Sequence, residues 1–358
     1  AAPPEAAERV CVANGIEAEE VMDALSHLVD KSLITADRPE GGETRYRLLE
    51  TIRQYALEKL ATSRELDESR DRHLMYFLNW AETAEAHLND AEQLGWLETY
   101  EREHDNLRAA LEWCNADSGR ASEGLRLAVA CAYFWRLRGY LSEGRAHVFA
   151  ALSHGKDDET TETRARALYW SASLAYVQSD YPATRVYGEA SLSLWRQLRN
   201  VGDGLADTLD LFGELATEQG DYATAPAFFE EALKIFRGLK DINGIGDMLM
   251  QLGWAYMRMG EYDKAAAHMG ESLTMFRETG HVSFLGFTLS GLGELAIRQG
   301  QFERAAQFLE ESLSIRRQHG HRWGMGASLG SLGWIAFCQH DYSSMRARLS
   351  ESLAIRTE

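Results

Sequence analysis

The densest run of ionisable side chains is EREHD, which begins at Glu101 and offers carboxylates and an imidazole of the kind used in acid–base catalysis. In a helix, however, only residues three or four positions apart meet. The pairs that remain are Glu101 with Asp105 and His104 with Arg108, and we expect the second to be a surface contact. No Ser or Cys nucleophile has a visible base, and neither HxxxH nor HExxH occurs. The sequence therefore predicts no catalytic residues, no metal ligands and no enzyme activity.

A glycine cluster, GHRWGMGASLGSLG from Gly320 to Gly333, has the composition of a nucleotide-binding loop. The phosphate-binding pattern GxxxxGK[ST] is nevertheless absent, and no predicted strand precedes the cluster, as a dinucleotide fingerprint requires. Its glycines stand at positions equivalent to Gly244, Gly246 and Gly253 one or more repeats away. A feature that recurs with a repeat belongs to packing, so we expect no cofactor in this chain.

The repeat has a period of forty residues and is clearest from residue 203. Four matching segments, GDYATAPAFFEEALKIF, GEYDKAAAHMGESLTMF, GQFERAAQFLEESLSIR and HDYSSMRARLSESLAIR, begin at Gly220, Gly260, Gly300 and His340. Between them lie LFGELATEQG, QLGWAYMRMG, GLGELAIRQG and SLGWIAFCQH. A fixed period of this size is typical of a solenoid, in which each unit buries its apolar face against its neighbours.

With 358 residues, 45% of them hydrophobic, and 5 prolines, the chain is expected to fold into uninterrupted helices. A net charge of −18 opposes binding to nucleic-acid phosphates and anionic membranes. The longest apolar run, Leu127 to Trp135, is shorter than the ~20 residues of a membrane-spanning helix. No signal peptide opens the chain, and its 4 distant cysteines indicate buried thiols in a reducing compartment, so we expect a cytoplasmic protein. The absence of an initial Met indicates a piece of a longer protein.

Residues 1–62 are predicted to form a small winged-helix domain. Two helices, the second from Glu17 to Lys31, precede the strands SLITAD and TRYRLL, which the turn RPEGGE joins into a hairpin. A third helix, ETIRQYALEKL, follows. Its apolar face is expected to consist of Ile52, Tyr55, Ala56 and Leu60.

Winged helices often bind DNA, but the charge of this one argues against it. The helix that would enter the groove carries five acidic residues against Lys31 alone, and such a face repels phosphates. The arginines on the wing side, Arg45, Arg47 and Arg53, are too few to offset this charge. We therefore expect a structural or regulatory role for this domain and no direct nucleic-acid binding.

Residues 63–121 are predicted to be a helical linker, and residues 122–358 an array of five or six helix pairs that is imperfect at first and sharpens toward the end. The tryptophans of the early helices follow the apolar stripes, so we expect them to form an aromatic core. They are Trp80, Trp96, Trp113 and Trp135. The predicted fold is all-α, with one small β-hairpin wing.

The repeat resembles the tetratricopeptide family, whose units are helix–turn–helix pairs. In one unit, Leu252-Gly253 and Tyr256 mark the first helix, and Gly260 marks the turn. Gly253 would let the two helices approach closely. The usual unit has about 34 residues, and we place the extra six of this one in the linker around residues 277–283.

A second resemblance covers residues 28–145. The segments LVDKSLI, RYRLLETIRQYALEKL, RHLMYFLNWAE, EREHDNLRAALEW and FWRLRGYLSEGR occur in that order. This succession is similar to the region after the nucleotide-binding domain in bacterial STAND-class regulators, including LuxR-type regulators and Streptomyces antibiotic regulatory proteins. The resemblance implies that ATP and Mg²⁺ belong to an upstream ATPase domain and that the repeats sense an inducer or a partner.

In tetratricopeptide arrays the first helix of each unit lines the concave groove, which implies where a partner would bind. Carrying those positions across gives an acidic wall beside aromatic and methionine side chains, suited to a basic, partly apolar peptide or a cationic small molecule. The alternative is that Trp254 and Trp334 pack between neighbouring units. The groove residues are Asp207, Asp210, Glu214, Glu218, Asp247, Met250, Trp254, Met257, Arg258, Phe287, Ser290, Glu294, Ile297, Arg298, Trp334 and Phe337.

The sequence thus favours the sensor and protein-interaction region of an ATP-dependent bacterial transcriptional regulator. An inducer or partner protein in the groove would control the nucleotide-binding module by shifting the packing of the array against the winged helix. The alternative is a passive scaffold that assembles proteins without switching. A hydrolase within the linker is a third possibility, which the missing nucleophile disfavours. The sequence leaves open the ligand, the promoter and the oligomeric state.

Overall fold

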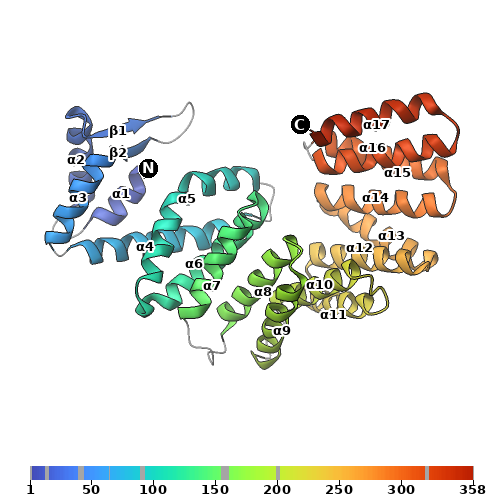
Figure 1. The fold of residues 1–358 in the computed structure, drawn as a ribbon, viewed down its shortest axis with the longest axis horizontal. Coiled ribbons are helices and arrows are strands. Elements are labelled where there is room, and N and C mark those ends of the chain that lie inside the picture. Colours follow the sequence, from blue (N-terminus) through green and yellow to red (C-terminus); the bar gives the residue numbers. More distant parts are fainter. Residues whose placement is uncertain are drawn as a thin grey trace. The chain divides into compact units, whose positions relative to one another are not determined.

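The computed structural model describes residues 2–12, 16–38, 44–63, 65–88, 93–154, 161–198, 202–318 and 322–357. Across these ranges the chain forms helices and one two-stranded antiparallel sheet (Figure 1), which confirms the predicted all-α fold with a single hairpin. The chain divides into two compact units, Ala1–Leu194 and Trp195–Glu358, which we name unit 1 and unit 2.

Unit 1 begins with the winged helix. Its elements are α1 (Pro4–Cys11), α2 (Ala18–Asp30), β1 (Ile34–Asp37), β2 (Arg45–Leu48) and α3 (Glu50–Ser63). A proline starts α1, and a capping box between Glu17 and Glu20 starts α2. The strands pair with Ile34 opposite Leu48. Most of the predicted turn between them, residues 39–43, lies outside the described residues.

Helix α3 does not bury the face expected for it. Tyr55 is 59% exposed, Ala56 is exposed, and Ile52 and Leu60 are only half-buried. This face stays largely uncovered because, among the described residues, α3 packs mainly on one neighbour, α4 (Leu66–Glu85). Its apolar residues therefore remain at the surface or line a pocket.

The helical linker consists of α4, α5 (Gln93–Asn115) and a short 3₁₀ turn at Ser118–Arg120. Tyr100 is fully buried, and its hydroxyl lies 3.0 Å from the carbonyl oxygen of Ala81 and 2.9 Å from that of Ala130. It thereby joins α4 to the helix that follows the linker. Trp135 is buried as predicted, whereas the other three tryptophans of the early helices are half-buried at the edge of this core.

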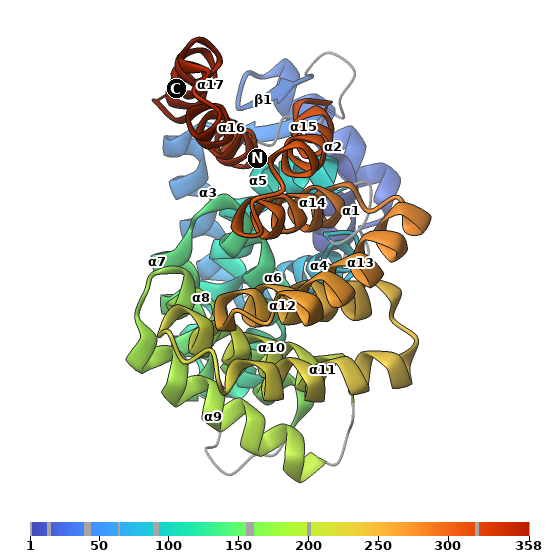
Figure 2. The ribbon, with the colours of Figure 1, turned by 90° about the vertical axis from the view of Figure 1, so that its right-hand side faces the viewer.

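Six helix pairs follow in the described part of the chain. They are α6 (Ala121–Arg138) with α7 (Leu141–His154), α8 (Glu162–Val177) with α9 (Tyr181–Leu198), α10 (Asp203–Glu218) with α11 (Ala225–Leu239), α12 (Ile242–Met259) with α13 (Tyr262–Thr279), α14 (Val282–Arg298) with α15 (Phe302–Gln318), and α16 (Arg322–Cys338) with α17 (Tyr342–Thr357). Figure 2 shows α10 to α17 stacked in sequence order in unit 2.

The turn between the helices of a pair has the same backbone geometry throughout. One residue in each turn has a left-handed φ between 60° and 81°: Gly139, Ser179, Gly220, Gly260, Gly300 and His340. Four of the six are glycine, the residue that adopts this conformation without steric cost. The repeated turn geometry therefore begins with α6 and α7, where the repeat is hard to recognise in the sequence.

A buried serine joins the two helices in most pairs. Its hydroxyl donates to a carbonyl oxygen 26 residues earlier, over 2.7–2.9 Å, in the pairs Ser191 with Ala165, Ser272 with Gly246, Ser312 with Gly286, and Ser352 with Gly326. Alanine replaces the serine at position 232. The close approach predicted at Gly253 is confirmed, because a Cβ there would lie 2.4 Å from Cγ of Met269.

The extra residues of each forty-residue unit do not form a linker. Helix α13 continues to Thr279, Gly280 takes a left-handed conformation, and α14 begins at Val282. The expectation of a linker around residues 277–283 is therefore wrong, because the additional residues lengthen the helices instead. Gly280, in its left-handed conformation, ends α13.

The first helices of the pairs form the tighter layer of unit 2. Backbones of α12 and α14 contact each other, as do those of α14 and α16. The second helices are instead bridged by long side chains, as in the Arg277–Glu311 ion pair at 2.7 Å. Because the inner side of a curved stack is the more closely packed one, the exposed sides of α10, α12, α14 and α16 form what we call the inner face.

Candidate functional sites on the inner face and in the winged-helix unit

The acidic part of the inner face comes from α10. Asp207, Asp210 and Glu214 are half-buried, and Glu218 is exposed. Glu214 accepts a hydrogen bond of 3.2 Å from the amide of Gln251 in the next pair, so one of its oxygens already joins two repeats. Asp247, one repeat later, is half-buried as well. These carboxylates can attract a cation to the face, with Glu218 the most accessible of them.

Two of the predicted contact residues belong to the interior. Met250 is 7% exposed and Met257 is 1% exposed, and Met257 packs with Ala265 and Leu295 between neighbouring pairs. Their side chains are therefore not available to a partner in this structure. A helix in the array has neighbours on both sides, so less of its surface stays free than the sequence indicates.

The two tryptophans at the same repeat position differ. Trp254 is half-buried, packs in the clusters that contain Met269 and Met257, and restricts the space at Gly291 of the next pair. Trp334 is 54% exposed and stacks on Phe337 with the ring centroids 5.5 Å apart. Trp254 therefore packs between neighbouring units. Trp334 and Phe337 lie on α16 of the last described pair, which no following pair covers among the described residues, and both are exposed.

The remaining predicted residues lie on the same helices. Arg258 and Arg298 are exposed, and Arg298 forms an ion pair of 3.1 Å with Glu294. The half-buried Ser290 and Ile297 accompany them. The inner face thus carries an ion pair between Arg298 and Glu294 as well as exposed aromatic side chains.

The sequence analysis missed Arg316 of α15. This side chain is 4% exposed, donates to the carbonyl oxygen of Gly324 (2.7 Å) and to the hydroxyl of Ser328 (3.2 Å), and lies 4.9 Å from the ring of Phe287. Burial lowers the pKa of Arg316 to about 10. The equivalent residues of the two preceding repeats are Phe236 and Phe276. The replacement of phenylalanine by arginine at this position is the one feature of the sequence that could have pointed to a buried charge.

The ionisable run of α5 is part of the interior of unit 1. His104 is 4% exposed, and its Nε2 lies 3.0 Å from Oε1 of Glu143, which also accepts two bonds from Arg108. The expectation of a surface contact between His104 and Arg108 is therefore wrong. Burial lowers the pKa of His104, with Glu143 acting against that shift. The arrangement fixes α5 to α7 and has no hydroxyl or thiol nucleophile among these contacts.

A second buried charge holds the wing to the linker. Glu103 is 3% exposed and forms an ion pair with Arg45 of β2. Glu103 also accepts a hydrogen bond of 2.7 Å from Asn106. On the other side of the winged helix, Arg72 of α4 donates to the carbonyl oxygen of Val10 at 2.7 Å. These polar contacts add to the apolar packing of α1 on α4, where Ala6 joins the core that contains Leu74 and Phe77.

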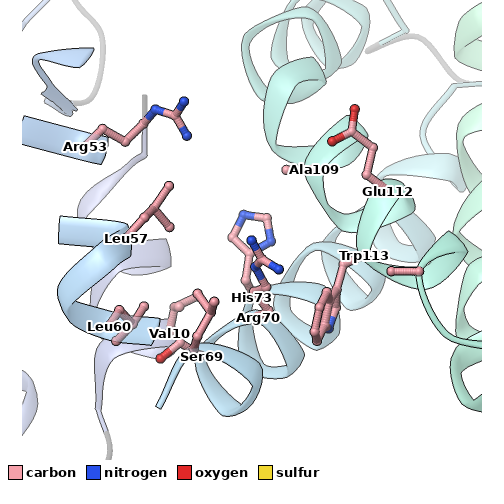
Figure 3. A pocket seen from close by; sticks show the side chains of 12 residues that line it. Val10, Arg53, Leu57, Leu60, Ser69, Arg70, His73, Ala109, Glu112 and Trp113 are labelled. Carbon is pink, nitrogen blue, oxygen red and sulfur yellow. The ribbon is translucent and has the colours of Figure 1, made fainter. Parts of the chain in front are cut away.

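A pocket of about 440 Å³ lies within unit 1, between the winged helix and the linker helices (Figure 3). Leu57 of α3 and Trp113 of α5 lie on opposite sides, with Arg70 and His73 of α4 between them. Its lining is Val10, Arg53, Leu57, Leu60, Leu66, Ser69, Arg70, His73, Ala109, Glu112, Trp113 and Ala116. Residues of α1, α3, α4 and α5 thus meet here.

Trp113 is the best-fixed residue of this pocket. Its Nε1 donates to Oδ1 of Asp71 at 2.8 Å, and the guanidinium groups of Arg70 and Arg120 lie 4.8 and 4.1 Å from its ring. Burial lowers the pKa of His73, against a hydrogen bond with Asn106. The pocket therefore combines a rigid aromatic wall with a neutral imidazole and a cationic edge.

The described residues contain no group of three or more His, Cys, Asp or Glu side chains placed to bind a metal ion. In the same part of the chain, no helix combines the length and apolar character needed to cross a bilayer. Of the four thiols, Cys114 and Cys131 are buried, Cys338 is partly exposed and Cys11 is exposed, so the expectation that all four are buried is wrong.

Comparisons with known proteins fit this architecture. The tetratricopeptide-repeat profile matches residues 163–238, 244–318 and 284–358, together more than half of the chain, and a winged helix-turn-helix profile matches residues 4–61. A Mycobacterium tuberculosis protein described as a candidate HTH-type transcriptional regulator is 35% identical over 242 residues. That match covers 66% of this chain but 27% of the relative, so the chain spans about a quarter of the relative's length.

Two solved structures share the fold at low sequence identity. A STAND protein with a tetratricopeptide-repeat sensor from Pyrococcus horikoshii is 14% identical, with a TM-score of 0.52, over 98% of this chain and 59% of that one. A Rap protein in complex with competence and sporulation factor is 10% identical, with a TM-score of 0.54, over 79% of this chain and 98% of that one. Both likenesses concern the fold alone.

Proposed function

Because this chain belongs to the tetratricopeptide-repeat family, we propose that it is the sensor and protein-interaction region of a bacterial transcriptional regulator. The observation that carries the proposal is one chain that joins a winged helix to repeats whose inner face exposes Trp334 and Phe337. Exposed aromatic side chains anchor partners because they bury much area at little entropic cost. The similarity to a longer mycobacterial regulator supports the regulatory role.

The partner on the inner face is a basic, partly apolar peptide segment. Glu218 and the half-buried carboxylates of α10 attract its positive charge, and Trp334 and Phe337 receive its apolar side chains. Met250 and Met257 take no part, since they are buried. The complex of a Rap protein with competence and sporulation factor is consistent with factor binding on such a fold.

In the full-length protein, the partner would control a nucleotide-binding module. The segments that resemble STAND-class regulators and the fold shared with a STAND repeat sensor support this step. A partner acts as a switch only if it binds two arrangements of the protein with different affinity. ATP hydrolysis by the full-length protein, measured with and without the bound peptide, tests this step, and an unchanged rate contradicts it.

Peptide binding itself is tested with a library of short peptides that vary independently in Lys/Arg and Leu/Phe content. We expect basic, apolar peptides to bind and Trp334→Ala to weaken them about tenfold or more. Arg346→Gln, which changes an exposed residue of α17, is the matched control and leaves affinity unchanged. Equal binding of acidic peptides, or full affinity in Trp334→Ala, contradicts the proposal.

The alternative function is a scaffold that holds partner proteins without switching, which the many fixed contacts between repeats favour. Solution X-ray scattering separates the two. A switch changes its scattering curve when the peptide binds, whereas a scaffold keeps the curve of the free protein apart from the added mass.

A further inference from the structure

Apolar side chains that are not part of the buried core line the pocket of unit 1. Leu57 and Leu60 come from α3, which buries none of its residues, and Leu66 comes from the start of α4. Trp113 faces them and is held by its bond to Asp71. A volume of about 440 Å³ falls within the range of small-molecule pockets, about 300–1,000 Å³.

The charge of the lining has one uncompensated member. Arg53 is bound by Glu50 through two hydrogen bonds of 2.9 and 2.7 Å. Arg70, in contrast, has no carboxylate within 4 Å among the described residues, and its guanidinium lies over the ring of Trp113. A guanidinium that stacks on an aromatic ring keeps its N–H groups free for an anion in the same plane.

The acidic residue of the lining does not cancel this charge. Glu112 and Arg70 are both exposed, so water screens both charges, but Glu112 makes no ion pair with Arg70 and leaves its guanidinium open to an anion. His73 is neutral near pH 7, because burial lowers its pKa, and it can serve as a donor or an acceptor. Ser69 adds a hydroxyl one residue before Arg70. The polar side of the pocket therefore matches a single negative charge.

From these contacts we propose that the pocket binds a small amphipathic monoanion, an aromatic or acyl carboxylate. Its apolar body lies between Leu57 and Trp113, and its carboxylate meets the guanidinium of Arg70. The site belongs to unit 1 and is independent of peptide binding on the inner face. Because its walls come from the winged helix on one side and the linker on the other, a bound ligand holds α3 against α4 and α5.

The experiment uses the whole chain of 358 residues and three probes of one shape that differ in charge: 2-naphthoate, the neutral 2-naphthamide and the cationic 2-naphthylmethylammonium. Titration calorimetry and ligand-observed NMR measure binding. We expect 2-naphthoate to bind with a Kd of about 10 μM to 1 mM, as its size allows. The Kd values of the amide and the cation should be about tenfold higher than that of 2-naphthoate, or higher still.

Two variants of the pocket test whether a positive charge at the site strengthens the binding of 2-naphthoate. Arg70→Gln should weaken 2-naphthoate about tenfold and leave the amide unchanged, whereas Glu112→Gln should strengthen 2-naphthoate by about two- to threefold. Arg346→Gln, another exposed arginine without an ion pair among the described residues, is the matched control. Circular dichroism confirms that each variant is folded.

Saturable binding of 2-naphthoate that Arg70→Gln weakens and Arg346→Gln does not would support the site. No saturable binding by 2-naphthoate, equal affinity for the amide, or an unchanged Kd in Arg70→Gln would each overturn it. A variant that fails to fold is replaced by Leu57→Asn, which should abolish binding of 2-naphthoate by placing an amide on the apolar wall. Retained affinity in that variant overturns the proposal as well.

Discussion

The winged helix and the repeats of unit 2 differ in how many apolar side chains they bury. Among the described residues of the winged helix, the buried apolar side chains are Pro3, Ala6, Val21 and Ile34, while Leu49 is 50% exposed. A single repeat pair such as α12 with α13 buries more than twice as many side chains. The repeats are thus stabilised by their own buried contacts, whereas the winged helix has a small core of its own and depends on its contacts with the linker, which are the packing of Ala6 and a few polar bonds.

This difference indicates which part of the chain can change its packing at the lowest cost in free energy. A domain with a small core that is held by a few charged contacts can be released without unfolding its neighbours. An array whose pairs share the same contacts resists local opening because each pair supports the next. The following predictions test that contrast, from the largest expected effect to the smallest.

The largest effect is expected from Phe276→Ala in the array. Phe276 is fully buried between Gly246 and Phe284, and removing such a side chain costs about 3–5 kcal/mol through lost burial and the cavity left behind. Leu57→Ala, at a half-buried position of α3, should cost about 1 kcal/mol or less. Urea unfolding measures both, and similar losses would contradict the contrast.

Glu103→Gln should act on the winged helix alone. The change leaves Arg45 half-buried without its counter-charge, which costs about 1–3 kcal/mol of docking free energy. Hydrogen exchange should quicken in residues 2–63 and stay unchanged in unit 2. As a control, Arg53→Gln breaks the exposed pair with Glu50, which water screens, and should change hydrogen exchange much less. Faster exchange throughout unit 2 in Glu103→Gln would refute the prediction.

Ser272→Ala should destabilise unit 2 by about 1 kcal/mol. The hydroxyl of Ser272 is buried and donates to the carbonyl oxygen of Gly246, which would lose a partner. Thr274→Ala removes a hydroxyl that donates to Gly270 at an exposed site and should change the free energy of unfolding less. Equal effects of the two changes in urea unfolding would show that the serine contact is not special.

His340→Gly should stabilise the protein slightly, by about 0.5–1 kcal/mol, because His340 has a φ of 62° where glycine occurs in four other turns. Gly260→Ala, at the equivalent position with a φ of 81°, should shift the melting temperature in the opposite direction. Melting temperatures that move in the same direction would argue against a shared turn geometry.

Much of the array could be predicted because its determinants are local. The forty-residue period, the glycine at 253 and the aromatic positions follow from residues that meet within one helix pair. The lengthened helices were missed because Gly280 ends α13 without a proline. The earliest pairs share the turn geometry at Gly139 and Ser179, although their sequences have diverged.

The sites were harder to predict, since they depend on which surfaces remain uncovered. Met257 and Trp334 both lie on first helices, yet Met257 is buried against α14 of the next pair, whereas Trp334 is exposed on α16 of the last described pair. Arg316 occupies a position held by phenylalanine in the two preceding repeats. The pocket beside Trp113 arises only when α3 rests on the linker, and no sequence pattern encodes that docking.

The recurrence of the serine contact has a consequence for how such a chain can change its length. Each of these hydroxyls reaches a carbonyl 26 residues earlier, and the turns of unit 2 recur every forty residues from Gly220 to His340, so the boundaries between its pairs are alike. Excising or duplicating one whole unit rejoins surfaces that already fit each other. Genetic insertions and deletions that are multiples of the repeat would therefore preserve the fold, and the extent of the binding face could evolve in whole steps.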